Sequence, residues 1–348
     1  MKRRALPWLL LLLAVLTGCG GDPTPGYGLS GEMDLLSAPD RRGAGEDDGI
    51  GADDDGVGSD GFQGLLDLTL DFGPGPETGG GPGLDLQEPP LCAPNGDGVL
   101  TAAELPTVIG AVAAFTEGPP GQTVAVPQPG GTWDGDCACH LWDFTATGPG
   151  DVQVWDGVLP ASGKWFDGEI PGGDFVQTFG GGLLGVYSLQ EDGLYMVGLA
   201  SVAEDWTALR YDPPVRLLSL PMALGDSWST QDAEAIGRFE GTAYPLDTGF
   251  TGVLSVEHTY SGKVDKRGRV EVPAGGFDAW RVVVDVTMVV RNSIAPLPVA
   301  SVHRKVVLFM AECSGLVARL RSVEGEVNDD FAAATEYRRF GWPQGGTR

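Results

Sequence analysis

Apolar stretches of strand length, separated by turn residues, recur in the second half of the chain. Residues 183–189 form one such stretch, Glu191-Asp192-Gly193 follows, and residues 194–199 resume the apolar pattern. Strand, tight turn and strand predict an antiparallel hairpin. Residues 306–310 and 316–320 flank Cys313-Ser314-Gly315 in the same way and predict a second hairpin.

Further segments favour strands over helices. Lys263 and Val264 precede Asp265-Lys266-Arg267-Gly268, and residues 269–272 follow, which predicts a third hairpin. The β-branched run 282–290 predicts one long strand. Residues 106–115 fit either a helix or a strand, and no amphipathic helix longer than three turns is evident. We therefore predict an all-β fold with antiparallel sheet, and a β domain over residues 107–348.

The N-terminus has the pattern of an export signal. Lys2, Arg3 and Arg4 precede the apolar run 5–16, and Leu16-Thr17-Gly18-Cys19 follows. These last four residues resemble the bacterial lipobox, which implies cleavage after residue 18 and a lipid on Cys19. An ordinary secretory signal with a chance cysteine is the alternative. By the same resemblance, Gly20 implies sorting to the outer membrane, with the chain facing either the periplasm or the cell surface.

Residues 19–91 differ in composition from the rest of the chain. Residues 20–91 contain 16 acidic residues, 2 basic residues and 19 glycines, and the whole chain has a formal net charge of −26. Low hydrophobicity and like-charge repulsion predict a disordered acidic tether. The segment 66–72 alternates apolar and polar residues, so it is either a strand that adds to a sheet edge or chance. The charge argues against nucleic acid and against anionic lipid surfaces as partners.

Five cysteines fit an oxidising compartment. With Cys19 assigned to lipid, the other four predict two disulfides with three alternative pairings. A metal site at Cys137-Ala138-Cys139-His140 is a rival interpretation, although no second Cys/His cluster completes a tetrahedron. The disulfide candidates are Cys92, Cys137, Cys139 and Cys313.

Residues 92–106 contain a partial calcium-loop pattern. From its third position onward this segment resembles an EF-hand, with Ala93 where that motif has its first aspartate. The alternative is a Gly/Asp turn in which Thr101 and Glu104 form a capping box at a short helical turn. The candidate ligands for calcium are Asn95, Asp97, the Val99 carbonyl, Thr101 and Glu104.

No local motif indicates catalysis. The chain has three histidines, and we expect His258 and His303 on solvated strand faces. Nothing local favours a Ser-His-Asp triad. Four tryptophans lie close in sequence. They form either a carbohydrate-stacking surface or part of the core and sheet packing, and we favour packing. They are Trp133, Trp142, Trp155 and Trp165.

Several turn and aromatic stretches resemble a family of uncharacterised β-rich lipoproteins from Gram-negative bacteria, over roughly residues 108–341. They are Trp142-Asp143-Phe144, Tyr211-Asp212-Pro213-Pro214, residues 221–228, residues 270–280 and Ser314-Gly315-Leu316-Val317. The resemblance implies one large, strongly curved antiparallel sheet, half-closed around a cavity, and no established activity.

Three hypotheses for function follow. The first is a lipid-anchored, non-enzymatic binding or structural module of the cell envelope. The second is a carrier that holds an apolar ligand in the concave sheet. The third, from a different class, is an envelope hydrolase. The membrane, through the N-terminal lipid, is the one partner that the sequence predicts, and calcium is the one candidate cofactor.

Overall fold

The computed structural model describes residues 92–133, 139–180, 183–202, 207–239, 252–292 and 298–341. The predicted signal, the acidic tether, Cys19 and Cys137 lie outside these ranges. Almost every regular element is a strand, and η2 is a single 3₁₀ turn. The elements are β1 (Val99–Leu100), η2 (Ala102–Glu104), β2 (Val112–Glu117), β3 (Val124–Ala125), β4 (Gly130–Trp133), β5 (Cys139–Asp143), β6 (Val152–Gly157), β7 (Leu159–Pro160), β8 (Phe175–Gly180), β9 (Leu183–Gln190), β10 (Gly193–Ser201), β11 (Ala208–Ser219), β12 (Met222–Ala223), β13 (Ser227–Phe239), β14 (Gly252–Val272), β15 (Gly275–Asn292), β16 (Pro298–Ala311), β17 (Gly315–Ser322) and β18 (Ala333–Phe340).

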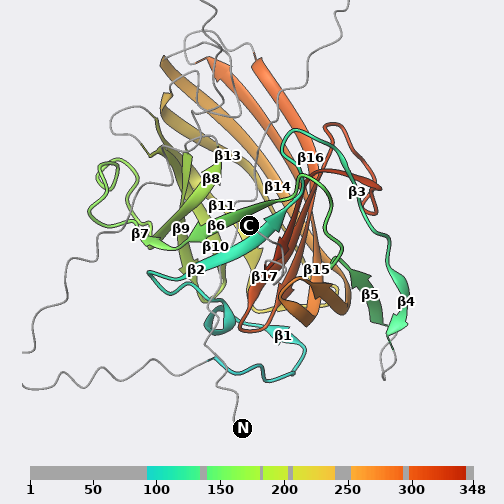
Figure 1. The fold of residues 1–348 in the computed structure, drawn as a ribbon. Helices are drawn as coiled ribbons and strands as arrows, with labels where there is room; N and C mark the ends of the chain where they lie inside the picture. Colours follow the sequence, from blue (N-terminus) through green and yellow to red (C-terminus); the bar gives the residue numbers. More distant parts are fainter. Residues whose placement is uncertain are drawn as a thin grey trace, which may run out of the picture. The chain divides into compact units, whose positions relative to one another are not determined.

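Sixteen of these strands form one sheet (Figure 1). Its main path runs β6-β2-β18-β17-β16-β15-β14-β13-β11-β10-β9-β8-β7, and β1 pairs separately with β12. Because β6 and β7 are separated by a single residue, the two ends of the path come close together and the sheet nearly closes on itself. All pairs are antiparallel except β5 with β14. The all-β fold and the large, strongly curved antiparallel sheet are confirmed.

The concave face of the sheet holds most of the core. Paired residues share a face, so His258, Met288, Tyr260 and Val286 all lie on one side of β14 and β15. On this side His258 contacts Tyr211 and the Tyr260 hydroxyl donates to the Leu217 carbonyl, both on β11, although β13 lies between β14 and β11; these contacts identify the side as the concave one. The large, fully buried side chains on this face include Trp280, Tyr187, Tyr211, Tyr260, Phe115 and Phe175.

Two outer layers cover parts of the convex face. Over β15 to β18, residues 139–151 and 323–332 pack Trp142, Phe144 and Phe331 against Phe309 and its neighbours. Over β8 to β11, the loop 161–174 packs Phe166 and Ile170 in a separate apolar cluster with Val186 and Ala208. Both layers bury strand positions that alternation alone would leave exposed.

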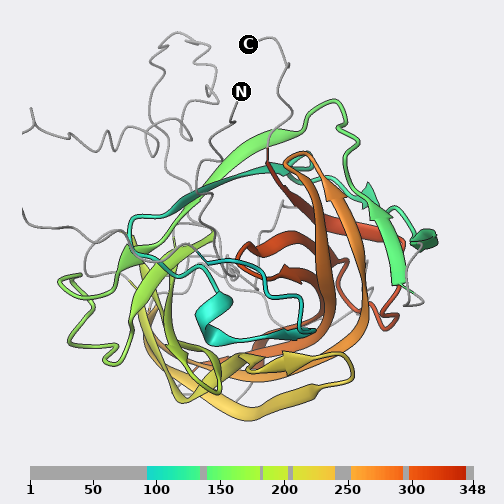
Figure 2. The same cartoon turned by 90° about the horizontal axis from the view of Figure 1, so that it is seen from below.

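Residues 92–111 lie across one end of the sheet, as the view along its axis shows (Figure 2). Leu100, Leu105 and Met222 are buried there in the main core cluster. The Cys313 amide donates to the Glu104 carbonyl at 3.0 Å, and a disulfide joins Cys92 to Cys313. We call residues 92–111 the end cap.

Two of the predicted hairpins and the predicted long strand are confirmed. The hairpin of β9 and β10 is confirmed, with Gln190 opposite Gly193, and so is the hairpin of β16 and β17. The run 282–290 lies within β15, as predicted. Within 106–115 the strand alternative holds, because β2 begins at Val112.

The hairpin predicted around residues 265–268 is wrong. β14 runs unbroken from Gly252 to Val272, and Asp265 marks only a shift in its register with β15. Gly268 serves close packing instead of a turn, because a Cβ there would lie 2.0 Å from the His140 carbonyl oxygen of β5. The observed turn follows at Pro273 and Ala274, between β14 and β15.

Candidate binding groove

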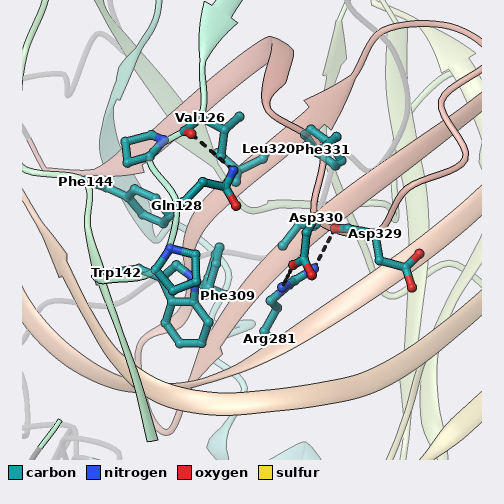
Figure 3. A pocket seen from close by; sticks show the side chains of 13 residues that line it. Val126, Gln128, Trp142, Phe144, Arg281, Phe309, Leu320, Asp329, Asp330 and Phe331 are labelled. Carbon is teal, nitrogen blue, oxygen red and sulfur yellow. Dashed lines mark hydrogen bonds and ion pairs between the residues drawn. The ribbon is translucent and has the colours of Figure 1, made fainter. Parts of the chain in front are cut away.

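Two cavities lie side by side on the convex face of the sheet. The first is small, about 20 Å³, with a floor of Trp142, Phe144, Val307, Phe309 and Leu320, and it is covered by the arm 126–129 (Figure 3). The second, of about 580 Å³, is open to solvent and crosses β13 to β16. Asp329 lines both cavities, so we treat them as one convex groove. Serines and paired charges line the second cavity: Ser227, Ser229, Ser261, Lys263, Asp285, Lys305 and Asp329.

Strand pairing places the polar side chains of this groove. Ser229 lies opposite Ser261, and Ser261 lies opposite Asp285. Asp285 in turn lies opposite Lys305. Since opposite residues in an antiparallel pair point to the same side, these four side chains form one row across four strands.

Ion pairs run along the groove from β16 to the loop 323–332. Asp285 contacts His303 at 2.8 Å and Lys305 at 2.7 Å. Asp329 contacts Lys305 at 3.1 Å and Lys263 at 2.6 Å. Burial alone would raise the pKa values of Asp285 and Asp329, but their lysine partners outweigh it and lower both. Both carboxylates are therefore charged at neutral pH.

Arg281 lines the first cavity and holds the loop segment that contains Asp329. Its side chain is only 4% exposed, and it pairs with Asp330 while donating to the Asp329 carbonyl at 2.6 Å (Figure 3). On its other side Asp265 lies 3.7 Å from the Arg281 Nε. Burial raises the pKa of Asp265 although Arg281, Lys266 and Lys263 act in the opposite direction. The second cavity is thus lined mainly by hydroxyls and matched charges, and this part of the groove suits a polar ligand.

Sequence reasoning did not identify this groove. The residues of its second cavity come from four strands and one loop, and none of them forms a local motif. The charged residues Arg281 and Asp285, four positions apart in a strand, were the available signal, because a strand places both on the same face.

The calcium-loop residues lie in the end cap, away from this groove. Asn95 Oδ1 accepts from the Asp97 amide, and Asp97 Oδ1 accepts from the Val99 amide. The Glu104 carboxylate turns back to accept from the Thr101 amide and hydroxyl, both at 2.9 Å. The capping box of the alternative interpretation is therefore formed, whereas calcium binding stays a prediction that calorimetric titration would test.

The structure shows one disulfide among the four candidate cysteines. Cys92 and Cys313 form a disulfide between residues 221 positions apart, one of the three pairings left open by the sequence. Cys137 lies outside the described residues, so neither a Cys137–Cys139 disulfide nor the metal site with His140 is tested. Within the described ranges, no three His, Cys, Asp or Glu side chains gather as a metal site would require.

The expectation for His258 is wrong. This residue is fully buried on the concave face, with its Nδ1 3.2 Å from the Tyr211 hydroxyl. Burial lowers the pKa of His258 to about 3, so the ring is neutral. His303 is partly exposed in the convex groove. The ring nitrogens of His258 and His303 thus contact Tyr211 and Asp285 respectively.

Of the four tryptophans, the structure describes the side chains of Trp142, Trp155 and Trp165. Trp142 is buried against Phe309, and Trp165 packs against Phe166 in the other apolar cluster. Trp155 is 56% exposed on β6. Packing is confirmed for Trp142 and Trp165, and a joint stacking platform that includes them is excluded.

A buried ionic network crosses the concave face between β17, β18 and β6. Glu336 pairs with Arg319 and with Arg321, and Arg338 contacts Asp156 at 2.6 Å and Glu117 at 2.8 Å. Burial would raise the pKa of Glu336, but the surrounding arginines lower it to about 2. The concave face thus holds packed aromatic rings together with fixed charges.

Comparison with solved structures finds a candidate lipoprotein from Parabacteroides distasonis, known from a crystal structure. The two chains are 11% identical, the match covers 67% of this chain and 94% of that chain, and the TM-score is 0.24. No family model and no curated protein matches this chain. None of the described helical residues forms a segment long and apolar enough to cross a bilayer. The residues of the convex groove alone therefore indicate its chemistry.

Proposed function

We propose that this protein is a lipid-anchored, non-enzymatic binding module of the cell envelope, which holds a polar ligand in the convex groove. One observation carries the choice of site. The cavities described above lie on the convex face, whereas the concave face is occupied by aromatic rings and by the Glu336 and Arg338 ion pairs. This arrangement favours groove binding over an apolar ligand inside the sheet.

Support for a location outside the cytosol comes from two independent features. The Cys92–Cys313 disulfide fits an oxidising compartment, where such bonds persist. The signal-like N-terminus ends at Leu16-Thr17-Gly18-Cys19, and an acyl chain contributes about 0.8 kcal/mol of membrane affinity per buried methylene. Gly20 supports the outer membrane as the destination.

Anchoring is tested on mature protein recovered from its host. Mass spectrometry of the N-terminal peptide should show residue 19 first, with fatty acids attached to it. The Cys19→Ser variant should lose the fatty acids and leave the membrane fraction. A mature chain that starts elsewhere, or that carries no acyl group, would contradict the proposal.

Groove binding is tested by native mass spectrometry of the same material. We expect a polar ligand on the wild-type protein that Ser261→Trp removes, because the indole would fill the open cavity. Ser255→Trp is the matched control, since Ser255 lies on the same strand and the same face but outside the groove. If both variants retain the ligand equally, the groove is not its binding site. If that retained ligand is apolar, the result favours a carrier that holds it in the concave sheet.

A further inference from the structure

Exposed apolar side chains gather at one corner of the sheet. The described residues leave ten large apolar side chains exposed, and five of these, between 39% and 56% exposed, belong to β2, β6, β7 and the turn before β2. We call this set the apolar corner. Its members are Val108, Ile109, Val112, Trp155 and Leu159.

Backbone pairing makes the apolar corner one continuous surface. Val112 lies opposite Gly157 and Ala114 opposite Trp155, so Val112 and Trp155 share the convex face of β2 and β6. The Gly110 amide donates to the Val158 carbonyl at 2.8 Å, which brings the turn 108–111 beside Leu159. Contiguous exposed apolar surface of this kind marks an interaction site.

The two segments that form the apolar corner carry no exposed charge, in a chain whose net charge is −26. Residues 108–116 and 152–160 contain one charged side chain, Asp156. Its carboxylate is buried and turned inward to Arg338, at 2.6 Å. A surface without charge fits an apolar or zwitterionic partner and not a charged one.

The position of the corner in the chain indicates which partner that is. The end cap leads directly into β2, and its first residue, Cys92, is fastened to Cys313 at the same end of the sheet. The predicted lipid anchor therefore enters the described domain through the element next to the corner. Tryptophan is enriched where protein meets the membrane interface, and tethering raises the local concentration enough for a small patch to bind.

We propose that the apolar corner rests on the zwitterionic surface of the bilayer to which the chain is anchored. This inference rests on the proposed lipid anchor and adds an orientation to it. With the corner on the bilayer, the domain is held against the membrane and does not rotate freely about its tether.

The test uses the chain from residue 19 onward with Cys19→Ser, so that lipidation cannot contribute. We expect it to float with phosphatidylcholine vesicles. Ile109→Ser with Val112→Ser should weaken vesicle affinity about tenfold, since less apolar surface leaves water. Ile236→Ser with Val253→Ser is the matched control, because these side chains are 54% and 47% exposed, against 48% and 55% in the corner. The control should bind like the parent chain.

Two further measurements sharpen the outcome. Vesicles should shift the tryptophan emission to the blue, and Trp155→Phe should remove that shift. Mixing phosphatidylglycerol into the vesicles should weaken binding, because the chain is acidic. Equal affinity of the corner and control variants, or no flotation of the parent chain, would overturn the inference.

A second copy of the chain is the alternative occupant. A dimer in vesicle-free sedimentation that the corner variant dissociates would also overturn the inference. The mass of the native N-terminal peptide shows separately whether the chain carries a lipid anchor. The vesicle experiment does not depend on that result, because its protein has no lipid.

Discussion

Buried ionisable side chains on the concave face govern how the stability of this protein depends on pH. Glu336 and His258 are both enclosed by the sheet, and both have lowered pKa values for different reasons. The arginines around Glu336 favour its charged form, whereas burial of His258 disfavours its charged form. Two pH windows, which overlap in part, follow from these shifts.

The His258 window lies between pH 6.5, its ordinary pKa, and about pH 3. In that range the unfolded chain binds a proton that the native chain does not, so stability is lost as the pH falls. We expect the free energy of unfolding to fall by about 1 kcal/mol per pH unit. Urea unfolding from about pH 7 to about pH 5 measures this slope. His258→Phe should remove it and His140→Phe should keep it; an unchanged slope in His258→Phe would refute the assignment.

The Glu336 window lies lower, between its ordinary pKa of 4.5 and about 2. A lowered carboxyl pKa contributes stability above the ordinary value, and this stability is lost as the pH falls through the native value. At neutral pH, Glu336→Gln should cost about 3–5 kcal/mol, because it leaves buried arginines without their charge partner. Thermal unfolding at neutral and acid pH, with exposed Glu191→Gln as the control, checks both effects. Equal losses in the two variants would contradict a special role for Glu336.

At the scale of elements, the end cap depends on its disulfide. The Cys92–Cys313 bond spans 221 residues, and the chain-entropy model assigns about 5 kcal/mol to closing a loop of that length. Cys92→Ala with Cys313→Ala should lower the free energy of unfolding by about this amount, as denaturant titration would show. Reducing agent should bring the wild type to the value of the variant and leave the variant nearly unchanged. A reductant-insensitive wild type would rule out this role.

The parallel strand β5 depends on Gly268. A Cβ at this position would lie 2.0 Å from the His140 carbonyl oxygen, so β14 and β5 could not stay paired there. Gly268→Ala should increase amide hydrogen exchange over residues 139–143 and lower the melting temperature. Gly168→Ala, where a Cβ meets nothing within 4 Å, is the control. Protection of residues 139–143 that survives in Gly268→Ala would disprove the close approach.

For the whole molecule, the sequence predicts a disordered acidic tether over residues 19–91, which lie outside the described ranges. Arg41 and Arg42 are the only trypsin sites within it. We expect limited trypsin digestion to cut there first and to leave a stable fragment that retains the Cys92–Cys313 disulfide. Mass spectrometry of the time course checks this order. Early cleavage within the sheet, with Arg41 and Arg42 protected, would show the tether prediction to be wrong.

Local patterns predicted elements whose causes are also local. The turn residues between 190 and 193 and between 311 and 315 lie where the structure has turns. Gly268 shows the limit of such local predictions. Glycine is required there by the close approach of His140, more than a hundred residues earlier, and not by its neighbours in sequence. The solvated face expected for His258 failed for a related reason: alternation shows that a strand has two faces but not which face another part of the chain will cover.

By itself, the sequence determined the all-β class, the hairpins closed by their own turn residues and the uneven distribution of charge, since these depend on residues near one another in the chain. Tertiary structure alone decided the pairing of Cys92 with Cys313, the burial of His258, and the meeting of Asp285, Lys305 and Asp329 in one groove. The physical reason is strand register. Pairing between distant strands sets which side chains face each other, and that pairing is fixed by packing of the whole sheet.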